Sequence, residues 1–151
     1  MLISKFDTAG VGEKVADLER RFGMELPEEY RRFLCRYNGG ETPETSFRMA
    51  RVSSDLRGFF GLGAAPADYR LEHCFDEDEL SVFVSEGIFP IGKNSFGDLL
   101  FIGVEGEFLG KILFQYHDKP KSLITLADSL SDFAAKCKSK KIKPCRSVEE
   151  R

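Results

Sequence analysis

Only two side chains in this sequence could act as imidazole bases, His73 and His117. Nucleophilic catalysis by serine or cysteine needs such a base within hydrogen-bond reach of the nucleophile. Neither histidine lies in a known nucleophile motif, and the Gly-x-Ser-x-Gly elbow of hydrolases is absent. We therefore expect a protein that is not an enzyme, with an uncharacterised hydrolase that uses His73 or His117 as the alternative.

Phosphate and metal sites are the next candidates, and residue spacing argues against both. Residues 58–63 have the sequence GFFGLG, in which two large phenylalanines fill the positions where a phosphate-binding loop needs small residues. His73 and Cys74 are adjacent, as are His117 and Asp118, and adjacent residues on a helix or strand do not easily face one ion. We expect no catalytic residue, no metal site and no cofactor.

The four cysteines, Cys35, Cys74, Cys137 and Cys145, include no Cys-x-x-Cys pair. In a chain of 151 residues this pattern indicates reduced thiols and a cytoplasmic protein. No stretch approaches the roughly 20 apolar residues that a membrane span requires. Residues 1–10 also lack the basic and apolar regions of a secretory signal, so we expect a cytoplasmic location and no membrane partner.

Charge is distributed unevenly along the chain, whose formal net charge is −3. Residues 1–134 contain 15 Lys+Arg and 23 Asp+Glu, which gives a net charge of −8. Residues 135–151 contain 7 Lys+Arg and 2 Asp+Glu, which gives a net charge of +5. An acidic body repels nucleic-acid phosphates and attracts basic proteins. We therefore expect a basic protein partner and no direct contact with nucleic acid. The basic segment 138–151 is expected to be a tail without fixed structure.

The densest run of acids lies in residues 68–79, where six carboxylates have only Arg70 to offset them. Such a patch would raise the rate of association with a basic partner. Tyr69 and Phe75 in the same segment could supply the apolar anchors of an interface. The alternative is a solvated loop whose two aromatic side chains are buried in the core. With two acids from the preceding segment, the predicted partner-binding residues are Glu41, Glu44, Asp68, Tyr69, Glu72, Phe75, Asp76, Glu77, Asp78 and Glu79.

Apolar residues recur at helical spacing in three parts of the chain. Residues 11–22 and 27–37 place apolar side chains every three or four positions, which predicts two N-terminal helices. Residues 123–137 have the same spacing, which predicts a C-terminal helix capped by Ser122 or Thr125.

Between these helices the apolar pattern is that of strands. Residues 64–87 are the exception, and we expect them to be irregular with at least one helical turn. The predicted class is α+β, a single domain over residues 1–137 with a mainly antiparallel sheet flanked by N-terminal helices and a C-terminal helix. The predicted strands are residues 47–51, 56–62, 88–91, 98–104 and 108–115, with a hairpin turn at residues 105–107.

The segment 26–40, LPEEYRRFLCRYNGG, resembles the signature of the SUKH superfamily, which includes the yeast cell-wall assembly regulators and many bacterial immunity proteins. Residues 59–63, 89–92 and 127–133 are similar to later pieces of the family pattern, although Leu130 stands where the family usually has Phe. Most of these positions form stop and start signals that any α+β domain needs. The positions that match are Glu19, Leu26, Pro27, Tyr30, Phe33, Leu34, Asn38, Gly39, Gly40, Pro90, Gly97 and Asp98.

The resemblance implies an α+β fold without catalytic residues or a cofactor. Bacterial members commonly neutralise a cognate toxin, often a nuclease, by binding it, and such toxins are frequently basic. Fungal members are instead regulatory scaffolds. We therefore expect a protein-binding module, either an immunity protein with a toxin partner or a regulator of the cell-wall assembly type without one.

Overall fold

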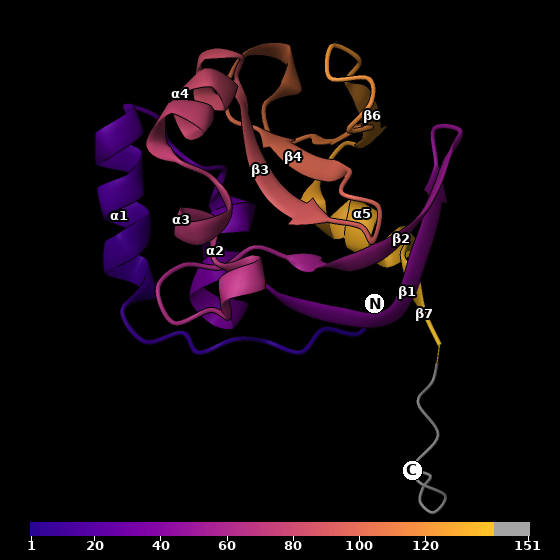
Figure 1. Cartoon of the computed structure of the whole chain (residues 1–151), viewed down its shortest axis with the longest axis horizontal. Helices are drawn as coiled ribbons and strands as arrows, with labels where there is room; N and C mark the ends of the chain where they lie inside the picture. Colours follow the sequence, from indigo (N-terminus) through magenta and orange to yellow (C-terminus); the bar gives the residue numbers. More distant parts are fainter. Residues whose placement is uncertain (141–151) are drawn as a thin grey trace, which may run out of the picture.

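The computed structural model describes residues 1–140 and forms a curled seven-stranded sheet with helices packed on it (Figure 1). The strand order is β6-β5-β4-β3-β2-β1-β7, and every neighbouring pair is antiparallel. The predicted α+β class, with N-terminal helices and a C-terminal helix, is confirmed. Residues 141–151, most of the predicted basic tail, lie outside the described residues.

Short connections join most of the strands that are neighbours in the sheet. In chain order the elements are α1 (Val11–Phe22), α2 (Glu28–Tyr37), β1 (Gly40–Met49), β2 (Val52–Phe59), the 3-10 turn η1 (Ala67–Tyr69), α3 (Leu71–Cys74), α4 (Glu77–Ser85), β3 (Ile88–Lys93), β4 (Leu99–Gly103), the 3-10 turn η2 (Gly106–Phe108), β5 (Ile112–Gln115), β6 (Ile124–Ala127), α5 (Leu130–Lys136) and β7 (Lys138–Ser139). Among residues 1–140 no helix has the length and apolar character needed to cross a bilayer.

Helices α1 and α2 form where the apolar spacing predicts them, and one carboxylate joins them. The buried face of α1 consists of Val11, Val15 and Leu18. Oε2 of Glu19 accepts a hydrogen bond from the backbone N–H of Leu26 at 2.8 Å and lies 3.2 Å from Nη2 of Arg31. Glu19 therefore holds the start of α2 against the end of α1, which gives this polar position of the family pattern a structural role.

The predicted C-terminal helix over residues 123–137 is wrong in its first half. Ile124–Ala127 form β6, which pairs with β5, and the helix begins only at Leu130. Its N-cap is Ser129, whose Oγ accepts from the backbone N–H of Asp132 at 3.0 Å, and not Ser122 or Thr125. The apolar residues at 123–127 fit a helix, but they also fit a strand with alternate burial. Hydrogen bonding to the free edge of β5 favoured the strand.

Other boundaries also differ from the sequence prediction, because turns replace some predicted strand residues and strand pairing adds others. Residues 106–108 form η2, so β5 starts at Ile112. β2 runs from Val52 to Phe59 and thus starts and ends earlier than predicted, while Arg51 lies in the β1–β2 turn with φ 68°. Lys138–Ser139 pair with β1, so the first residues of the predicted tail form a short strand.

Asn38 joins three segments at the end of α2. Its side chain is fully buried, and its Nδ2 donates to the carbonyls of Asp7 and Leu62, each at 2.8 Å. Its Oδ1 accepts from the backbone N–H of Leu62 at 2.7 Å. A side chain at Gly39 would meet the carbonyl oxygen of Phe60 at 2.5 Å, so the backbones approach too closely for any residue but glycine. The Asn-Gly-Gly motif therefore clamps α2 to the chain that leaves β2.

The main core lies between the sheet and the helices and is built on phenylalanine. Phe133 of α5 is fully buried and stands edge-on to Phe47, with ring centroids 5.3 Å apart. Phe59 of β2 contacts both Phe133 and Phe33 of α2 in the same edge-on manner. Edge-on aromatic pairs add to the stabilisation from burial alone.

We expect Asn38→Ala to lower the free energy of unfolding by about 2–4 kcal/mol, because it leaves three backbone groups, of which the two of Leu62 are buried, without their hydrogen-bond partner. Urea denaturation measures this change. Asn38→Gly is the matched control, since glycine relieves the left-handed backbone (φ 54°) but restores none of the hydrogen bonds. If Asn38→Gly is as stable as the wild type, the three bonds do not contribute as argued.

Candidate functional site

The acidic run Asp76–Glu79 starts a helix and is not an irregular loop, which corrects the prediction for this part of residues 64–87. Asp76 is the N-cap of α4, and its Oδ1 accepts from the backbone N–H of Glu79 at 2.8 Å. In turn, Oε1 of Glu79 accepts a hydrogen bond from the backbone N–H of Asp76 at 3.0 Å. This capping box, together with negative charge in the first turn, favours the helix. Two of the four acids thus have a local structural role.

Groups from distant segments contact three other residues of the acidic segment, and one of these contacts is an ion pair. Arg21 of α1 lies 2.9 Å from Oε1 of Glu77. Glu72 accepts from the backbone N–H of Gly63 at 3.0 Å. Lys93 of β3 donates to the carbonyl of Asp68 at 2.6 Å. Arg70 is the only Lys or Arg within the segment itself, but tertiary contacts also bring Arg21 to the carboxylate of Glu77 and Lys93 to the backbone of Asp68.

Tyr69 and Phe75 are core residues, as the alternative interpretation of this segment supposed. They are 5% and 9% exposed. Phe75 stands edge-on to Phe60 and Phe83, and the Tyr69 ring lies 5.5 Å from that of Phe6. The short elements η1, α3 and α4 bury these rings as they cover the sheet, so neither can act as the exposed anchor of an interface.

The two acids of β1 lie in different surroundings. Oε2 of Glu41 is 3.4 Å from the hydroxyl of Tyr69, so the fold brings Glu41 to the acidic segment. Glu44 is exposed on β1, and its carbonyl accepts from the N–H of Lys140. Among the predicted partner-binding acids, Glu44, Asp68 and Asp78 are those whose carboxylates make no hydrogen bond or ion pair within residues 1–140, since the others are engaged internally.

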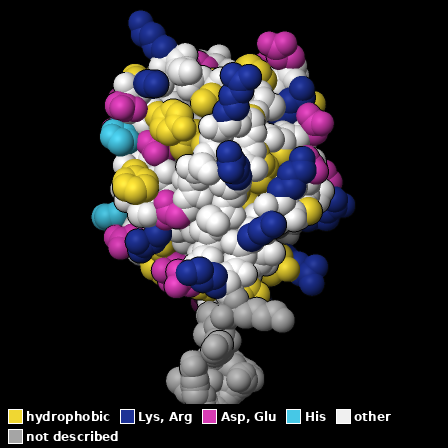
Figure 2. All heavy atoms as spheres, turned by 90° about the vertical axis from the view of Figure 1, so that its right-hand side faces the viewer, with side chains coloured by type: hydrophobic (Ala, Val, Ile, Leu, Met, Phe, Trp, Pro, Cys, Tyr) yellow, Lys and Arg dark blue, Asp and Glu magenta, His cyan; other side chains and the backbone are white. Residues whose placement is uncertain are grey.

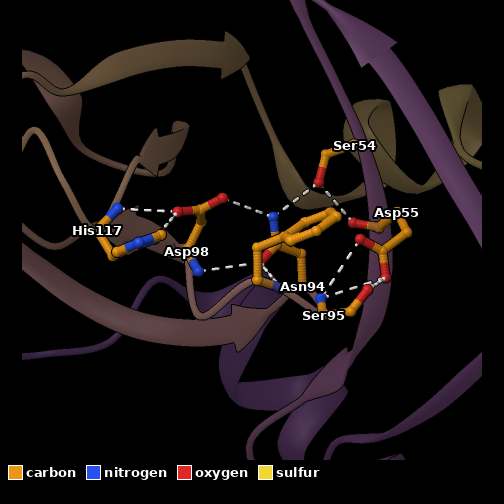
Figure 3. A network of polar contacts seen from close by, with 7 residues as sticks. Ser54, Asp55, Asn94, Ser95, Asp98 and His117 are labelled. Atoms are coloured by element: carbon orange, nitrogen blue, oxygen red, sulfur yellow. Dashed lines mark hydrogen bonds and ion pairs between the residues drawn. The ribbon is translucent and has the colours of Figure 1, made fainter.

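A second polar cluster surrounds Asp98, whose side chain is almost completely buried (Figure 3). Its Oδ1 accepts from the backbone N–H of His117 at 2.8 Å and lies 2.8 Å from Nδ1 of the same residue. Its Oδ2 accepts from Nδ2 of Asn94 at 2.9 Å, while the N–H of Asp98 donates to Oδ1 of Asn94. The carboxylate therefore ties the loop after β5 to the turn between β3 and β4.

The same turn is held from its other side by β2. The backbone N–H of Ser95 lies 3.2 Å from Oδ2 of Asp55, and the Ser95 hydroxyl contacts the same carboxylate oxygen. Nδ2 of Asn94 also donates to Oγ of Ser54 at 2.9 Å (Figure 3). Residues 94–98 are thus fixed by side chains from two distant segments, and the tip of the turn carries Phe96.

Hydrogen bonds keep Asp98 ionised despite its burial. Burial alone would raise the pKa of this carboxyl, but the Asn94 amide, the His117 backbone N–H and the His117 ring together lower the pKa of Asp98 below its usual value. His117 is 60% exposed at its side chain, so it carries an oriented ring on the surface. In the described part of the chain no serine or cysteine is hydrogen-bonded to that ring, and the hydrolase alternative stays a prediction.

The sequence also matches the model of a known protein family. Residues 12–136 match the model of the SMI1 / KNR4 family (SUKH-1). The chain belongs to this family. Among curated proteins, none matches the chain. In this SUKH-1 protein most of the motif positions have structural roles, since Leu26, Tyr30 and Leu34 are buried, and Asn38 and Asp98 bond across segments.

Sequence reasoning found Asp98 as part of the SUKH-1 pattern but missed the partners that surround it. The four-residue spacing of Asn94 and Asp98 could have indicated an Asn side chain that bonds its own turn. Asp55 and His117 gave no comparable signal, because they lie 40 and 19 residues from the groups they contact. Only the pairing of β2 with β3 and of β4 with β5 brings them together.

Replacing Asp98 with Asn should lower the free energy of unfolding by about 1–3 kcal/mol at about pH 7, because an amide cannot accept all the bonds that converge on the carboxylate. The lowered pKa means that the contribution of Asp98 is complete above about pH 4 and is lost as pH falls through the pKa of the folded state.

The difference between Asp98→Asn and the wild type should therefore shrink toward about pH 3 in urea denaturation. Asp118→Asn, an exposed neighbour of His117, is the control and should change stability little at either pH. A difference that stays constant with pH would contradict an ionised Asp98.

Proposed function

We propose that this SUKH-1 protein is a non-enzymatic binding module, and specifically an immunity protein that neutralises a cognate toxin domain by direct contact. The match of residues 12–136 to the SUKH-1 family carries the proposal. The placement of the motif residues supports it, because they stabilise the fold and leave the surface free to vary with the partner. In this view the fold is a scaffold, and specificity lies in exposed side chains.

The partner proposed is basic, as toxins that act on nucleic acid often are. The −8 charge of residues 1–134 supports this through long-range attraction, which raises association rates. Asp68, Asp78 and Glu44 are the predicted acids that retain no internal partner in the described residues, so they can contact such a protein. The site of action proposed is the cytoplasm, where reduced cysteines such as the exposed Cys35 are stable.

A second candidate is a regulatory scaffold of the cell-wall assembly type, without a toxin. The family to which the chain belongs carries the name of such regulators. Pull-down with the full chain separates the two candidates: cellular housekeeping proteins as specific partners favour the scaffold, and a toxin domain favours the immunity protein.

The deciding experiment is co-expression of the chain with the toxin domain encoded beside it. Growth should be restored, and the purified proteins should form a complex. Asn38→Ala, which lowers stability, provides a control that should rescue less well. If the folded chain is expressed and growth is not restored, or if no toxin gene lies nearby, the immunity assignment fails.

We further expect the double substitution Asp68→Lys/Asp78→Lys to slow association with a basic toxin domain by about tenfold at low salt, because exposed charges mainly set the on-rate. The reduction in rate should be smaller at about 0.15 M salt, where the Debye length falls to about 8 Å. Stopped-flow fluorescence measures the association rate constant at each salt concentration.

Asp68 and Asp78 are chosen because neither takes part in the capping box of α4 or in the ion pair between Arg21 and Glu77. Substitutions at those other acids would also disturb the fold. Asp118→Lys/Asp128→Lys makes the same charge change beside β5 and β6 and is the matched control. Equal rates for both double variants and the wild type would remove the acidic segment from the interface.

A further inference from the structure

Phe96 is the most exposed large hydrophobic side chain in residues 1–140, at 73%. Most of the other phenylalanines are in the core, so its position at the tip of the β3–β4 turn is unusual for this chain. Isolated exposed apolar residues are common on proteins and need no explanation by themselves. What distinguishes Phe96 is the way its turn is held.

The turn that carries Phe96 is fixed by buried polar groups. The backbone N–H of Phe96 donates to Oδ1 of Asn94 at 3.0 Å, and Asn94 and Asp98 are 6% and 5% exposed. Asp55 holds the neighbouring Ser95 from β2. Burying these groups costs free energy unless every one is bonded, which they are here. The result is an aromatic ring presented to solvent on a rigid backbone, so little ordering entropy is lost when a partner binds.

Phe96 forms one wall of a groove of about 720 Å³ on the outward face of β1 and β2. The strand register places the exposed side chains in rows, with Ser46 opposite Asp55 and Lys138, and Arg48 opposite Ser53. The groove therefore combines hydroxyl groups with cations. Its exposed polar and charged lining includes Ser46, Arg48, Ser53, Lys136 and Lys138.

The charge of this groove is opposite to that of the whole chain. Arg48 and Lys138 make no ion pair within residues 1–140, and Lys136 contacts only Asp132, at 3.4 Å. The one acid of the groove, Asp55, is already engaged by Ser95. Figure 2 shows lysine and arginine side chains over the middle of this face, around an area of uncharged atoms, with acidic side chains mainly toward its margins.

We propose that this groove is a second contact surface, which binds an acidic segment of a protein partner, with Phe96 packed against an apolar side chain of that segment. Charge complementarity selects an acidic occupant, and a rigid exposed aromatic is typical of the residues that dominate interface energies. The groove lies at the β1–β2 end of the sheet, on the opposite side of the molecule from α1 and α4 (Figure 1). The proposal does not require that the partner be a toxin.

A nucleic acid is the weaker candidate for this groove. Proteins that bind phosphate backbones usually carry a strong positive charge, whereas this chain has a net charge of −3 and a pI near 5.5. A local basic groove on an acidic body fits a short acidic polypeptide better, because the surrounding acids limit the length of polyanion that can be accommodated.

Fluorescence anisotropy with a labelled oligoglutamate peptide that contains a central leucine tests the proposal on the full chain. The peptide should bind saturably at low salt, and Arg48→Glu/Lys138→Glu should weaken binding at least about tenfold. Phe96→Ala should weaken binding of this peptide several-fold but should leave an otherwise identical peptide with serine in place of leucine unaffected. Thermal unfolding should show that both variants remain folded, because all three side chains are exposed.

Lys14→Glu/Arg20→Glu on α1 is the matched control, since it reverses two exposed charges far from the groove. An equal loss of binding in this control would show general electrostatic attraction and would overturn the proposal. So would absence of saturable binding, or no effect of Phe96→Ala on either peptide. A single-stranded oligothymidylate of the same charge that binds as tightly and competes would instead make the groove a nucleic-acid site.

Discussion

Asn38 occupies the point where the segment before α1, the end of α2 and the chain leaving β2 meet. Its side chain bonds the backbone of Asp7 once and that of Leu62 twice, in a position with no access to water. The sheet can pack on the N-terminal helices only if these backbones approach within the space that Gly39 leaves free. Because an unbonded buried amide is costly, this arrangement excludes most other placements of α2 on the sheet.

The Asp98 cluster uses the same physical device for a different purpose. There, too, a buried side chain satisfies backbone groups from distant parts of the chain, and its charge is maintained by the bonds it accepts. The Asn38 cluster lies inside the fold and holds helices to the sheet. The Asp98 cluster lies at the ends of the central strands β3 and β4, where it holds the turn that presents Phe96 outward.

Two surfaces of opposite charge follow from this arrangement. Acids gather at α4 and α3, where several also cap the helix or pair with Arg21, and three cations from β1, β7 and the end of α5 line the groove on the other side. If the proposed binding functions hold, this SUKH-1 protein has one surface of each charge sign for partners. The acidic and the basic surface lie on different elements, and neither includes the buried motif residues. Substitutions on one surface can therefore leave the other surface and the core unchanged.

The sequence by itself determined the α+β class, helices α1 and α2 and the family, since these depend on local apolar spacing and on turn residues such as Pro27 and Asn38. It also located the acidic segment, but it could not show that Tyr69 and Phe75 are buried. The division of residues 123–137 into β6 and α5 was decided by the tertiary structure, because an unpaired edge of β5 was available there. The groove beside Phe96 also depends on the tertiary structure, because its residues are up to about ninety positions apart and become neighbours through the pairing of β1 with β2 and β7 and the packing of α5 and the β3–β4 turn beside them.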